Sequence, residues 1–449
     1  MQRKRVMAAL VAAVVGLTSL APAATYYLDA INGSDSTGDG SSGSPWASMS
    51  KVFTAVQPGD TVLLRPGNYG SVTFDEGEGV GSSAGDVTYR ADPDTTTARP
   101  SWWYEDGLDR PDPDNPGDKV IFTGILFDAY YDTWDPDTKE GTSAGHYVTL
   151  DGLNVVGGNI TFKSFVSHVT VRNCNVFGNW SDYSSQVTSD AFNLYRAYSL
   201  GSDYRHILVE DCYGTHCTGG TILLGNFDDV TIRGCHFEHM AGTMMSVQGT
   251  MTDVILDGNH AHNQVAVASS LKHTRTVTAV GSPANTTFTV DDDVTYHDSV
   301  AVTDASTGQE EMRKVSSFDH TTYEVVLAEP LSFDVSVDDT VEFWDDSHGS
   351  GLAVRNGNFT LRNNRIHDLG ATRGIYVYDP PTNGYPNIVV ENNLIYSTIN
   401  QYTVDFNNGL GDNCVIRNNT FAGRKHKNYD AGDAYLYYGF GMVGATAAS

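Results

Sequence analysis

Cysteine is scarce in this chain, with 5 residues among 449. A fold built on disulfides is therefore excluded, although Cys212 and Cys217 are close enough in sequence to pair. The sequence also has no close Cys or His pair repeated at the spacing of a zinc site. We expect neither a disulfide scaffold nor a zinc centre, and we expect no organic cofactor.

Basic residues are also few. The chain has 27 Lys and Arg against 55 Asp and Glu, which gives a formal net charge of −28. A surface this acidic argues against nucleic acid and anionic membranes as partners. An anionic polymer can still bind where the few bases gather locally.

Only the first residues of the chain form a long apolar run. Arg3, Lys4 and Arg5 precede the apolar stretch 6–20, and Ala21-Pro22-Ala23 provides a small-x-small cleavage site. This is the pattern of a secretory signal peptide over residues 1–23. We therefore expect an exported protein with no membrane span, and a monomer.

The most informative feature is a short pattern that occurs eight times. Each copy reads aliphatic, charged, then small or polar, and all but the first continue with Cys or Asn. The sign of the charge alternates along the chain. The charged positions are Asp151, Arg172, Glu210, Arg233, Asp257, Arg362, Glu391 and Arg417. Strands stacked in parallel would place each charge between two opposite charges.

The spacing of the Cys or Asn positions predicts a β-solenoid. Successive positions are 38, 23, 24, 105, 29 and 26 residues apart, and a period in the twenties fits one coil of such a stack. β-Branched runs such as 169–171 and 207–209 precede the pattern, and a second strand follows in each period. We interpret the Asn and Cys column as an inward or turn-facing ladder and the charges as structural pairs.

The chain then divides into four parts. These are the signal peptide (1–23), an N-terminal cap with the first coils (24–274), an inserted small β domain (275–345) and the remaining coils (346–449). The segment Ser48 to Val56 is the one plausible short helix and would cover the open end of the stack. We expect the insert to be a compact β-barrel or β-sandwich. It could bind sugar, or it could serve only as a stabilising or spacing module. The charge alternates from Asp257 to Arg362 across the insert, which favours an insert within one coil. An insert that spans three coils would give the same alternation of sign.

These features resemble the right-handed parallel β-helix (pectin-lyase-like) superfamily. The resemblance rests on the repeats and on the entry segment, which contains Tyr26-Tyr27-Leu28-Asp29, Asn32-Gly33-Ser34-Asp35, Pro45-Trp46 and Pro58-Gly59-Asp60. It covers residues 25–90 and 146–440, apart from the insert, and implies an all-β right-handed parallel β-helix. The fold hosts lyases, hydrolases, epimerases, esterases and adhesins, so it does not fix the reaction. For a lyase, the resemblance implies a cleft on one long sheet, a Lys or Arg base, and Ca²⁺ held by carboxylates.

Alternation along the second strand of each repeat predicts which residues point outward. The expected outward column is Tyr195, Gly225, Gln248, Ala268, Arg355, Tyr378 and Asp405, with a second column of Asn193, Leu223, Ser246, Ala266, Ala353, Tyr376 and Thr403. This arrangement suits β-elimination from a uronic-acid polymer. Lys272 or His273 would be the base, Arg355 would bind the carboxylate, and Tyr378 would be the acid. Tyr376 would stack on a sugar ring, and Asp405 would contact substrate.

Two further groups of residues are candidates for binding. A basic run at Arg424, Lys425 and Lys427, with Arg373 in an equivalent turn, could hold an anionic polymer. Oxygen ligands for Ca²⁺ occur in two places. These are Asp29, Asp35 and Asp39 in the entry loop, and Asp190 with Asn193 near the expected cleft.

The sequence thus favours a secreted, carbohydrate-active β-helix, with a lyase on an acidic polysaccharide as the first hypothesis. A non-catalytic adhesive β-helix is the alternative. A glycoside hydrolase is a third possibility, but it needs paired carboxylates, and Asp405 has no evident acidic partner.

Overall fold

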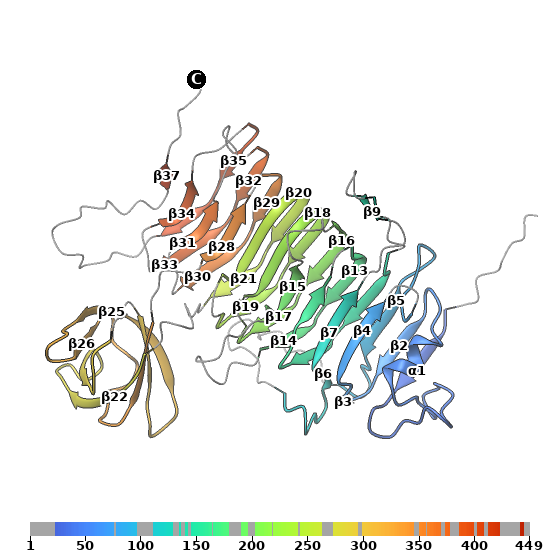
Figure 1. The fold of residues 1–449 in the computed structure, drawn as a ribbon, viewed down its shortest axis with the longest axis horizontal. Helices are drawn as coiled ribbons and strands as arrows, with labels where there is room; N and C mark the ends of the chain where they lie inside the picture. The colour runs from blue at the N-terminus through green and yellow to red at the C-terminus, as the bar shows by residue number, and fades with distance from the viewer. Residues whose placement is uncertain are drawn as a thin grey trace, which may run out of the picture.

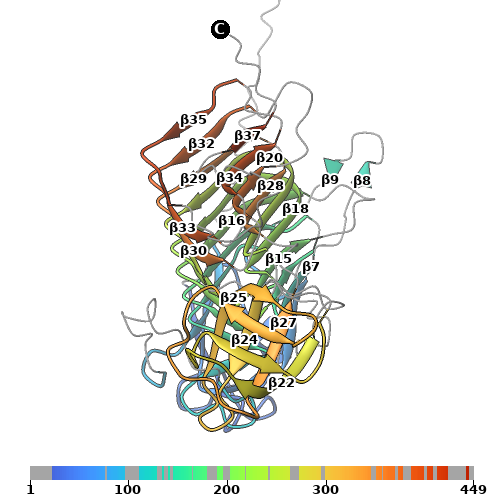
Figure 2. The same ribbon diagram turned by 90° about the vertical axis from the view of Figure 1, so that its left-hand side faces the viewer.

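The protein is a three-sided stack of parallel strands with a small barrel inserted in its later half (Figures 1 and 2). The computed structural model describes residues 23–75, 78–96, 111–128, 134–135, 140–141, 145–163, 165–178, 190–195, 203–217, 219–240, 243–262, 273–294, 299–344, 350–355, 357–369, 373–377, 386–398, 402–407, 412–422 and 441–443. The expected signal peptide, except for Ala23, lies outside this part of the chain. Within it, no helix is long and apolar enough to cross a membrane.

Each coil of the stack contributes to three faces in a fixed order. The middle face comes first and contains β4 (Ser71–Asp75), β7 (Gly124–Asp128), β12 (Ile160–Phe162), β15 (Phe192–Tyr195), the first parts of β18 (Thr221–Arg233) and β20 (Met245–Asp257), β28 (Ser350–Arg355), β31 (Arg373–Val377), β34 (Tyr402–Asn407) and β37 (Gly441–Val443). All of these neighbours pair in parallel.

The ladder face comes next and carries the alternating charges. It contains β1 (Thr25–Leu28), β2 (Thr61–Leu64), β5 (Val87–Ala91), β10 (Val148–Asp151), β13 (Ser167–Arg172), β16 (Asp203–Glu210), the second parts of β18 and β20, β29 (Phe359–Arg362), β32 (Ile388–Glu391) and β35 (Val415–Arg417). The short face completes the coil with β3 (Gly67–Asn68), β6 (Val120–Phe122), β11 (Asn154–Val156), β14 (Asn175–Phe177), β17 (Tyr213–Thr215), β19 (His236–Glu238), β21 (His260–His262), β30 (Arg365–Leu369), β33 (Leu394–Thr398) and β36 (Thr420–Ala422).

The alternating charges pair between coils, as the sequence predicted. Arg172 lies 3.1 Å from Asp151, and the pairs Arg233–Glu210 and Arg417–Glu391 repeat the arrangement further along the stack. The structure adds Arg90, which lies 3.6 Å from Asp151 on the other side. Each arginine is about half exposed, so a single ion pair contributes little to stability. The column of pairs instead helps to fix which residues of neighbouring coils lie opposite one another.

The small residue after each charge has a conformational cause. Gly152, Asn173, Asp211, Gly234, Gly258, Asn363, Asn392 and Asn418 all have φ between 50° and 74°. This left-handed conformation is cheapest for glycine and tolerable for Asn and Asp. The chain turns here from the ladder face to the short face, which explains why the third position of the repeat is restricted.

The next residue points inward and forms the expected ladder. Asn259 donates from Nδ2 to Oδ1 of Asn364 at 3.0 Å, Asn364 donates in the same way to Asn393, and Asn393 donates to Asn419. In earlier coils Cys174, Cys212 and Cys235 occupy the column as buried free thiols. Cys217 is also a free thiol, so the suggested pairing with Cys212 is wrong.

A short helix covers the N-terminal end of the stack. Helix α1 (Met49–Phe53) begins after Ser48, whose side chain accepts a hydrogen bond from the backbone N–H of Lys51. Met49 and Val52 are buried against the first coils. The helix is shorter than the expected Ser48 to Val56 because the chain turns after Thr54 toward Pro58 and Gly59.

The insert is a closed antiparallel barrel, and Figure 1 shows it as a separate body beside the later coils. Its strands are β22 (His273–Val280), β23 (Thr287–Val290), β24 (Ser299–Thr303), β25 (Glu310–Phe318), β26 (Glu324–Leu327) and β27 (Thr340–Trp344). Its core is a hydrophobic cluster of its own. Strand β28, the first strand after the insert, pairs directly with β20 of the coil before it, so the barrel interrupts the stack between neighbouring coils. Between residues 92 and 145, the described residues include strands β6 and β7 of the stack and a short hairpin of β8 (Trp134–Asp135) and β9 (Glu140–Gly141).

Candidate functional site

One column of residues crosses the middle face in register. It runs through Asn193, Ile222, Ser246, Ala353, Tyr376 and Asp405 on successive coils. Tyr376 lies between Ile375 and Val377, which are fully buried in the core, so alternation places the half-buried Tyr376 on the outer side. Ser246 and Ala353 are small and nearly buried, with exposed fractions of 4% and 7%.

The register corrects two of the expected columns. Asp405 pairs with Tyr376 and not with Tyr378, because Val404 and Phe406 align with Ile375 and Val377. Tyr378 itself lies outside the described residues. The second correction concerns Gly225 and Leu223, which were expected to face outward with Tyr195 and Asn193. Tyr195 is instead in register with Leu224, and Leu223 is buried in the core.

Of the three residues expected beside this column, the structure describes two and leaves Lys272 outside the described residues. Arg355 ends β28 in register with Gln248, two residues beyond Ala353. From strand geometry its Cα lies about 8 Å from that of Tyr376, one coil across and two residues along. His273 is the first residue of the barrel strand β22, opposite Phe343, and so belongs to the barrel and not to the middle face.

Among the basic candidates, Arg373 begins β31 in register with Ser350 and Tyr402. Arg424, Lys425 and Lys427 lie outside the part of the chain that the structure describes. Their proposed contact with an anionic polymer stays a prediction.

The acidic side chains of the entry loop have a structural role. Asp29 Oδ1 accepts hydrogen bonds from the backbone N–H groups of Ile31 and Asn32 at 3.0 and 2.8 Å. Burial alone would raise the pKa of Asp29, but these bonds outweigh it and lower the pKa. Asp35 accepts in the same way from Ala47 and Ser48, and Asp39 accepts from the backbone N–H of Ser41. These bonds explain the three carboxylates without a cation, and Ca²⁺ binding in this loop stays a prediction.

Asp190 and Asn193 differ from the entry loop. Asp190 is 7% exposed, and burial raises its pKa to about 7. Oδ1 of Asp190 and Oδ1 of Asn193 are both buried and accept no hydrogen bond from any described residue. Oxygen atoms of this kind suit a hard cation such as Ca²⁺, and a cation at these two residues stays a prediction.

A second group of polar residues gathers on the outer side of the short face. In register, Tyr213 is followed by His236, His260 and Arg365. The next outward column has Thr215, Glu238 and His262. His367 on β30 and Tyr396 on β33 continue this second column in register. We call His236, Glu238, His260, His262 and His367 the histidine cluster.

The imidazoles of the histidine cluster converge. His236 Nε2 lies 2.6 Å from His262 Nε2, and His260 Nε2 lies 2.8 Å from His367 Nε2. Glu238 Oε2 is 3.6 Å from His262 Nε2 and 3.9 Å from His236 Nε2. The Tyr213 hydroxyl donates to the other carboxylate oxygen of Glu238. His236 is fully buried, and burial together with the neighbouring histidines lowers its pKa to about 2.

The sequence patterns described above did not predict this cluster. A signal was present, because the cluster residues occupy the first and third positions after the Cys or Asn ladder. They occur in Cys235-His236-Phe237-Glu238 and in Asn259-His260-Ala261-His262. Sequence motifs for zinc sites describe ligands that are close together in one segment. They do not describe ligands that come from successive coils of a solenoid.

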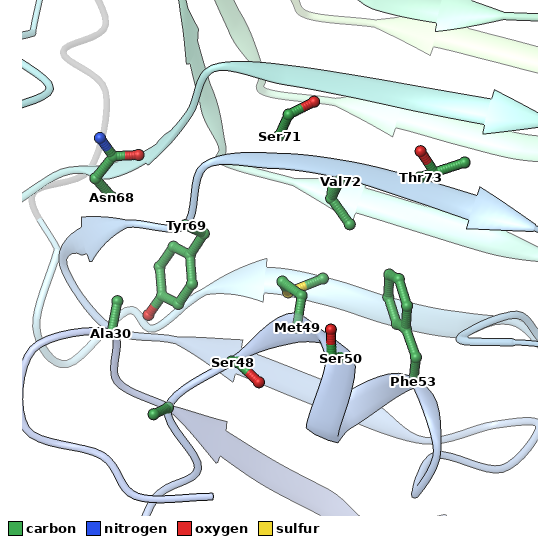
Figure 3. A pocket seen from close by; sticks show the side chains of 11 residues that line it. Ala30, Ser48, Met49, Ser50, Phe53, Asn68, Tyr69, Ser71, Val72 and Thr73 are labelled. Atoms are coloured by element: carbon green, nitrogen blue, oxygen red, sulfur yellow. The ribbon is translucent and has the colours of Figure 1, made fainter.

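The structure also has a cavity of about 430 Å³ beside the cap helix (Figure 3). Met49 and Phe53 of α1 line it from one side, and Val72 and Thr73 of β4 from the other. Its titratable group is Tyr69, whose hydroxyl donates to the backbone carbonyls of Leu28 and Arg65 and whose pKa is raised by burial. The cavity is therefore a poor candidate for catalysis.

The strand pairing defines the class of the protein, which is a parallel β-helix with an N-terminal cap and an inserted barrel. Neither a protein-family model nor the sequence of a curated protein matches the chain. Among solved structures it is similar to pectate lyase Pel9A, with 12% identity and a TM-score of 0.48 over 92% of this chain and 83% of that one. It is also similar to the GH136 lacto-N-biosidase from Eubacterium ramulus, with 11% identity and a TM-score of 0.42 over 89% and 68% of the two chains. For a rhamnogalacturonan lyase the values are 13% and 0.35 over 82% and 87%.

Proposed function

We propose that this is a secreted enzyme that cleaves an acidic polysaccharide by β-elimination on its middle face. The observation that carries the proposal is the register of Tyr376 with Asp405, in the same column as Asn193. Asn193 and Tyr376 are separated by four coil steps, or about 19 Å at the usual strand spacing. An extended polymer lying along the stack could contact both ends of this column.

The reaction requires three functions near one sugar. A base removes the proton beside the carboxylate, the electron pair forms the double bond, and the glycosidic carbon–oxygen bond breaks. The leaving oxygen then takes a proton. We assign this proton to the phenol of Tyr376, which replaces Tyr378 as the proposed acid because Tyr376 is the residue beside Asp405.

The remaining roles stay as the sequence suggested them. Arg355 would bind the substrate carboxylate, because a guanidinium bonds it in a bidentate manner and stabilises the charge that develops on it. Asp405 would contact a hydroxyl of the sugar. Lys272 stays the proposed base. Asp190 and Asn193 would hold Ca²⁺ at the far end of the column, where the ion would bind a carboxylate of the polymer.

The proposal is tested with alginate, pectate and glycosaminoglycans, each with and without Ca²⁺. We expect the ultraviolet absorbance of an unsaturated product to rise on one of them. We expect Tyr376→Phe to lower kcat by at least about a hundredfold, in the range of lost general acid catalysis. Tyr323→Phe, at a half-buried tyrosine of the barrel, is the matched control and should leave the rate unchanged.

Two other outcomes identify the alternatives. New reducing ends without ultraviolet absorbance would indicate a hydrolase, and binding without cleavage would indicate an adhesive protein. Either result on all the acidic polymers would contradict the lyase.

A further inference from the structure

The histidine cluster is distinct from the middle face and takes no part in the proposed elimination. Its residues come from three consecutive strands of the short face, β19, β21 and β30. Ligand atoms of His236, His260 and His262 all lie within 4.8 Å of one another. Glu238 adds a carboxylate within 4 Å of two of these rings.

We propose that His236, His260 and His262 bind a divalent transition-metal ion of the zinc class, with Glu238 as the fourth ligand. Imidazole nitrogen suits Zn²⁺, Cu²⁺ and Ni²⁺, whereas Ca²⁺ prefers oxygen ligands. Three imidazoles with one carboxylate complete a four-coordinate site.

The distances support this coordination. With metal–ligand bonds of about 2.0–2.2 Å, the ligand atoms of a tetrahedral site lie about 3.3–3.5 Å apart. The separations from Glu238 Oε2 to His262 and His236, 3.6 and 3.9 Å, are close to this value. The His236–His262 separation of 2.6 Å is a hydrogen bond, so the two rings would move apart by less than about 1 Å when a metal replaced it.

The surroundings of the cluster match those of metal ligands. Tyr213 donates a hydrogen bond to Glu238, and His367 shares one with His260. Partners of this kind orient the ligands and fix the imidazole tautomer. His236, Glu238 and His262 are nearly buried, with exposed fractions of 0%, 6% and 8%.

A simpler explanation is a stack of aromatic rings, which this solenoid uses elsewhere. Tyr147, His168 and His206 stack along the ladder face with centroids 4.2 and 4.6 Å apart. In the histidine cluster, however, two nitrogen pairs face each other at hydrogen-bonding distance and a buried carboxylate lies beside them. Stacking alone does not require either feature.

The position of the site indicates what it does. β21 ends at His262, the barrel follows, and the chain returns to the stack at Ser350 in β28. A metal held by β19 and β21, with His367 of β30 bonded to His260, would tie together the coils on both sides of the insertion. A metal that binds the folded state and not the unfolded state would therefore stabilise the stack at the point where the barrel is inserted.

The test uses the full chain, purified without a histidine tag and stripped with a chelator. After equilibration with Zn²⁺ and removal of free ion, we expect one zinc per chain by elemental analysis. Titration with Co²⁺ should produce the visible absorption of a four-coordinate nitrogen site. Zn²⁺ should also raise the Tm, and Ca²⁺ should not reproduce that rise.

The variant His260→Gln/His262→Gln should lose stoichiometric zinc, the Co²⁺ absorption and the Zn²⁺-dependent rise in Tm. His206→Gln, which removes an exposed histidine of the ladder face, is the matched control and should retain all three. Wild-type protein that binds no more Zn²⁺ than the double variant, or that gives no Co²⁺ absorption, would overturn the proposal even if the double variant fails to fold. These readouts do not depend on catalysis, so the proposed lyase activity and the proposed metal site can be contradicted independently of each other.

Discussion

Arg362 contacts Asp257 although the two residues are 105 positions apart in sequence, with the barrel between them. The guanidinium Nη2 lies 2.8 Å from the carboxylate Oδ2, and the two residues are also in register as strand partners. Asn363 donates a further hydrogen bond to the same carboxylate at 2.7 Å. The charge ladder therefore continues through the insertion, and the two flanking coils stack as neighbours although the barrel separates them in sequence.

The first prediction concerns this pair. Arg362→Asp would place three acids in a row, because Glu391 is the register partner on the next coil. We expect a loss of about 1 kcal/mol, since like charges repel but the site is partly exposed and screened. The midpoint of urea unfolding should fall and recover partly in high salt. Arg362→Gln removes the charge without repulsion and should cost only a few tenths of a kcal/mol; a loss as large as that of Arg362→Asp would contradict the electrostatic explanation.

The second prediction concerns the asparagine ladder. Asn364 is 1% exposed, accepts from the backbone N–H and Nδ2 of Asn259, and donates to the carbonyl of Leu256. Asn364→Ala leaves these buried groups without partners and should cost about 3 kcal/mol, measured as a fall in the unfolding midpoint. Asn392→Gly is the control, because Asn392 is exposed with φ of 58°. It should change stability by only a few tenths of a kcal/mol.

Much of the fold could be predicted because a solenoid repeats its constraints. The charge, the left-handed turn residue and the inward Asn or Cys recur in each coil, so eight copies together indicated the stack. The face with Tyr376 was harder to predict. Thr221 to Leu224 contains three consecutive apolar residues with no alternation, so the sequence could not show that Leu223 faces inward.

Other features depend on contacts that a linear pattern does not contain. Strand β25 of the barrel is hard to predict from sequence because Glu310, Glu311, Arg313 and Lys314 hide the alternation of its few apolar residues. The histidine cluster was missed because its ligand atoms come from different coils. Residues of this kind are recognised only once the register between coils is known.

The third prediction concerns pH. His146 is fully buried with Nε2 3.2 Å from the carbonyl oxygen of Asp128, and burial lowers its pKa to about 4. The unfolded chain has a histidine pKa of about 6.5 and binds the proton first as pH falls. The stability from neutral His146 is therefore fully present above about pH 6.5 and is lost as pH falls toward about 4.

Between about pH 7 and pH 5 this residue should account for a loss of about 2 kcal/mol. The unfolding midpoints of the wild type and of His146→Gln, measured at both values, isolate its share from that of other groups. We expect the variant to lose less stability than the wild type over this interval. An equal loss in the two proteins would rule out His146 as the source.

The fourth prediction concerns removal of the barrel. Its first and last strands pair with each other, with His273 opposite Phe343, so the chain enters and leaves the barrel at neighbouring points. The barrel core is also separate from the core of the stack. Replacing residues 273–344 with a short Gly-Ser linker should therefore leave the stack folded.

Contacts within the stack also hold the two coils on either side of the barrel in register. Asn259 bonds to Asn364, and Arg362 bonds to Asp257, whether or not the barrel is present. We expect circular dichroism to keep its β signature and the Tm to change by only a few degrees. The variant Arg362→Asp in the barrel-deleted chain should cost as much as it does in the full chain. A deletion that unfolds the stack, or that makes this cost much larger, would show that the barrel itself holds the two coils together.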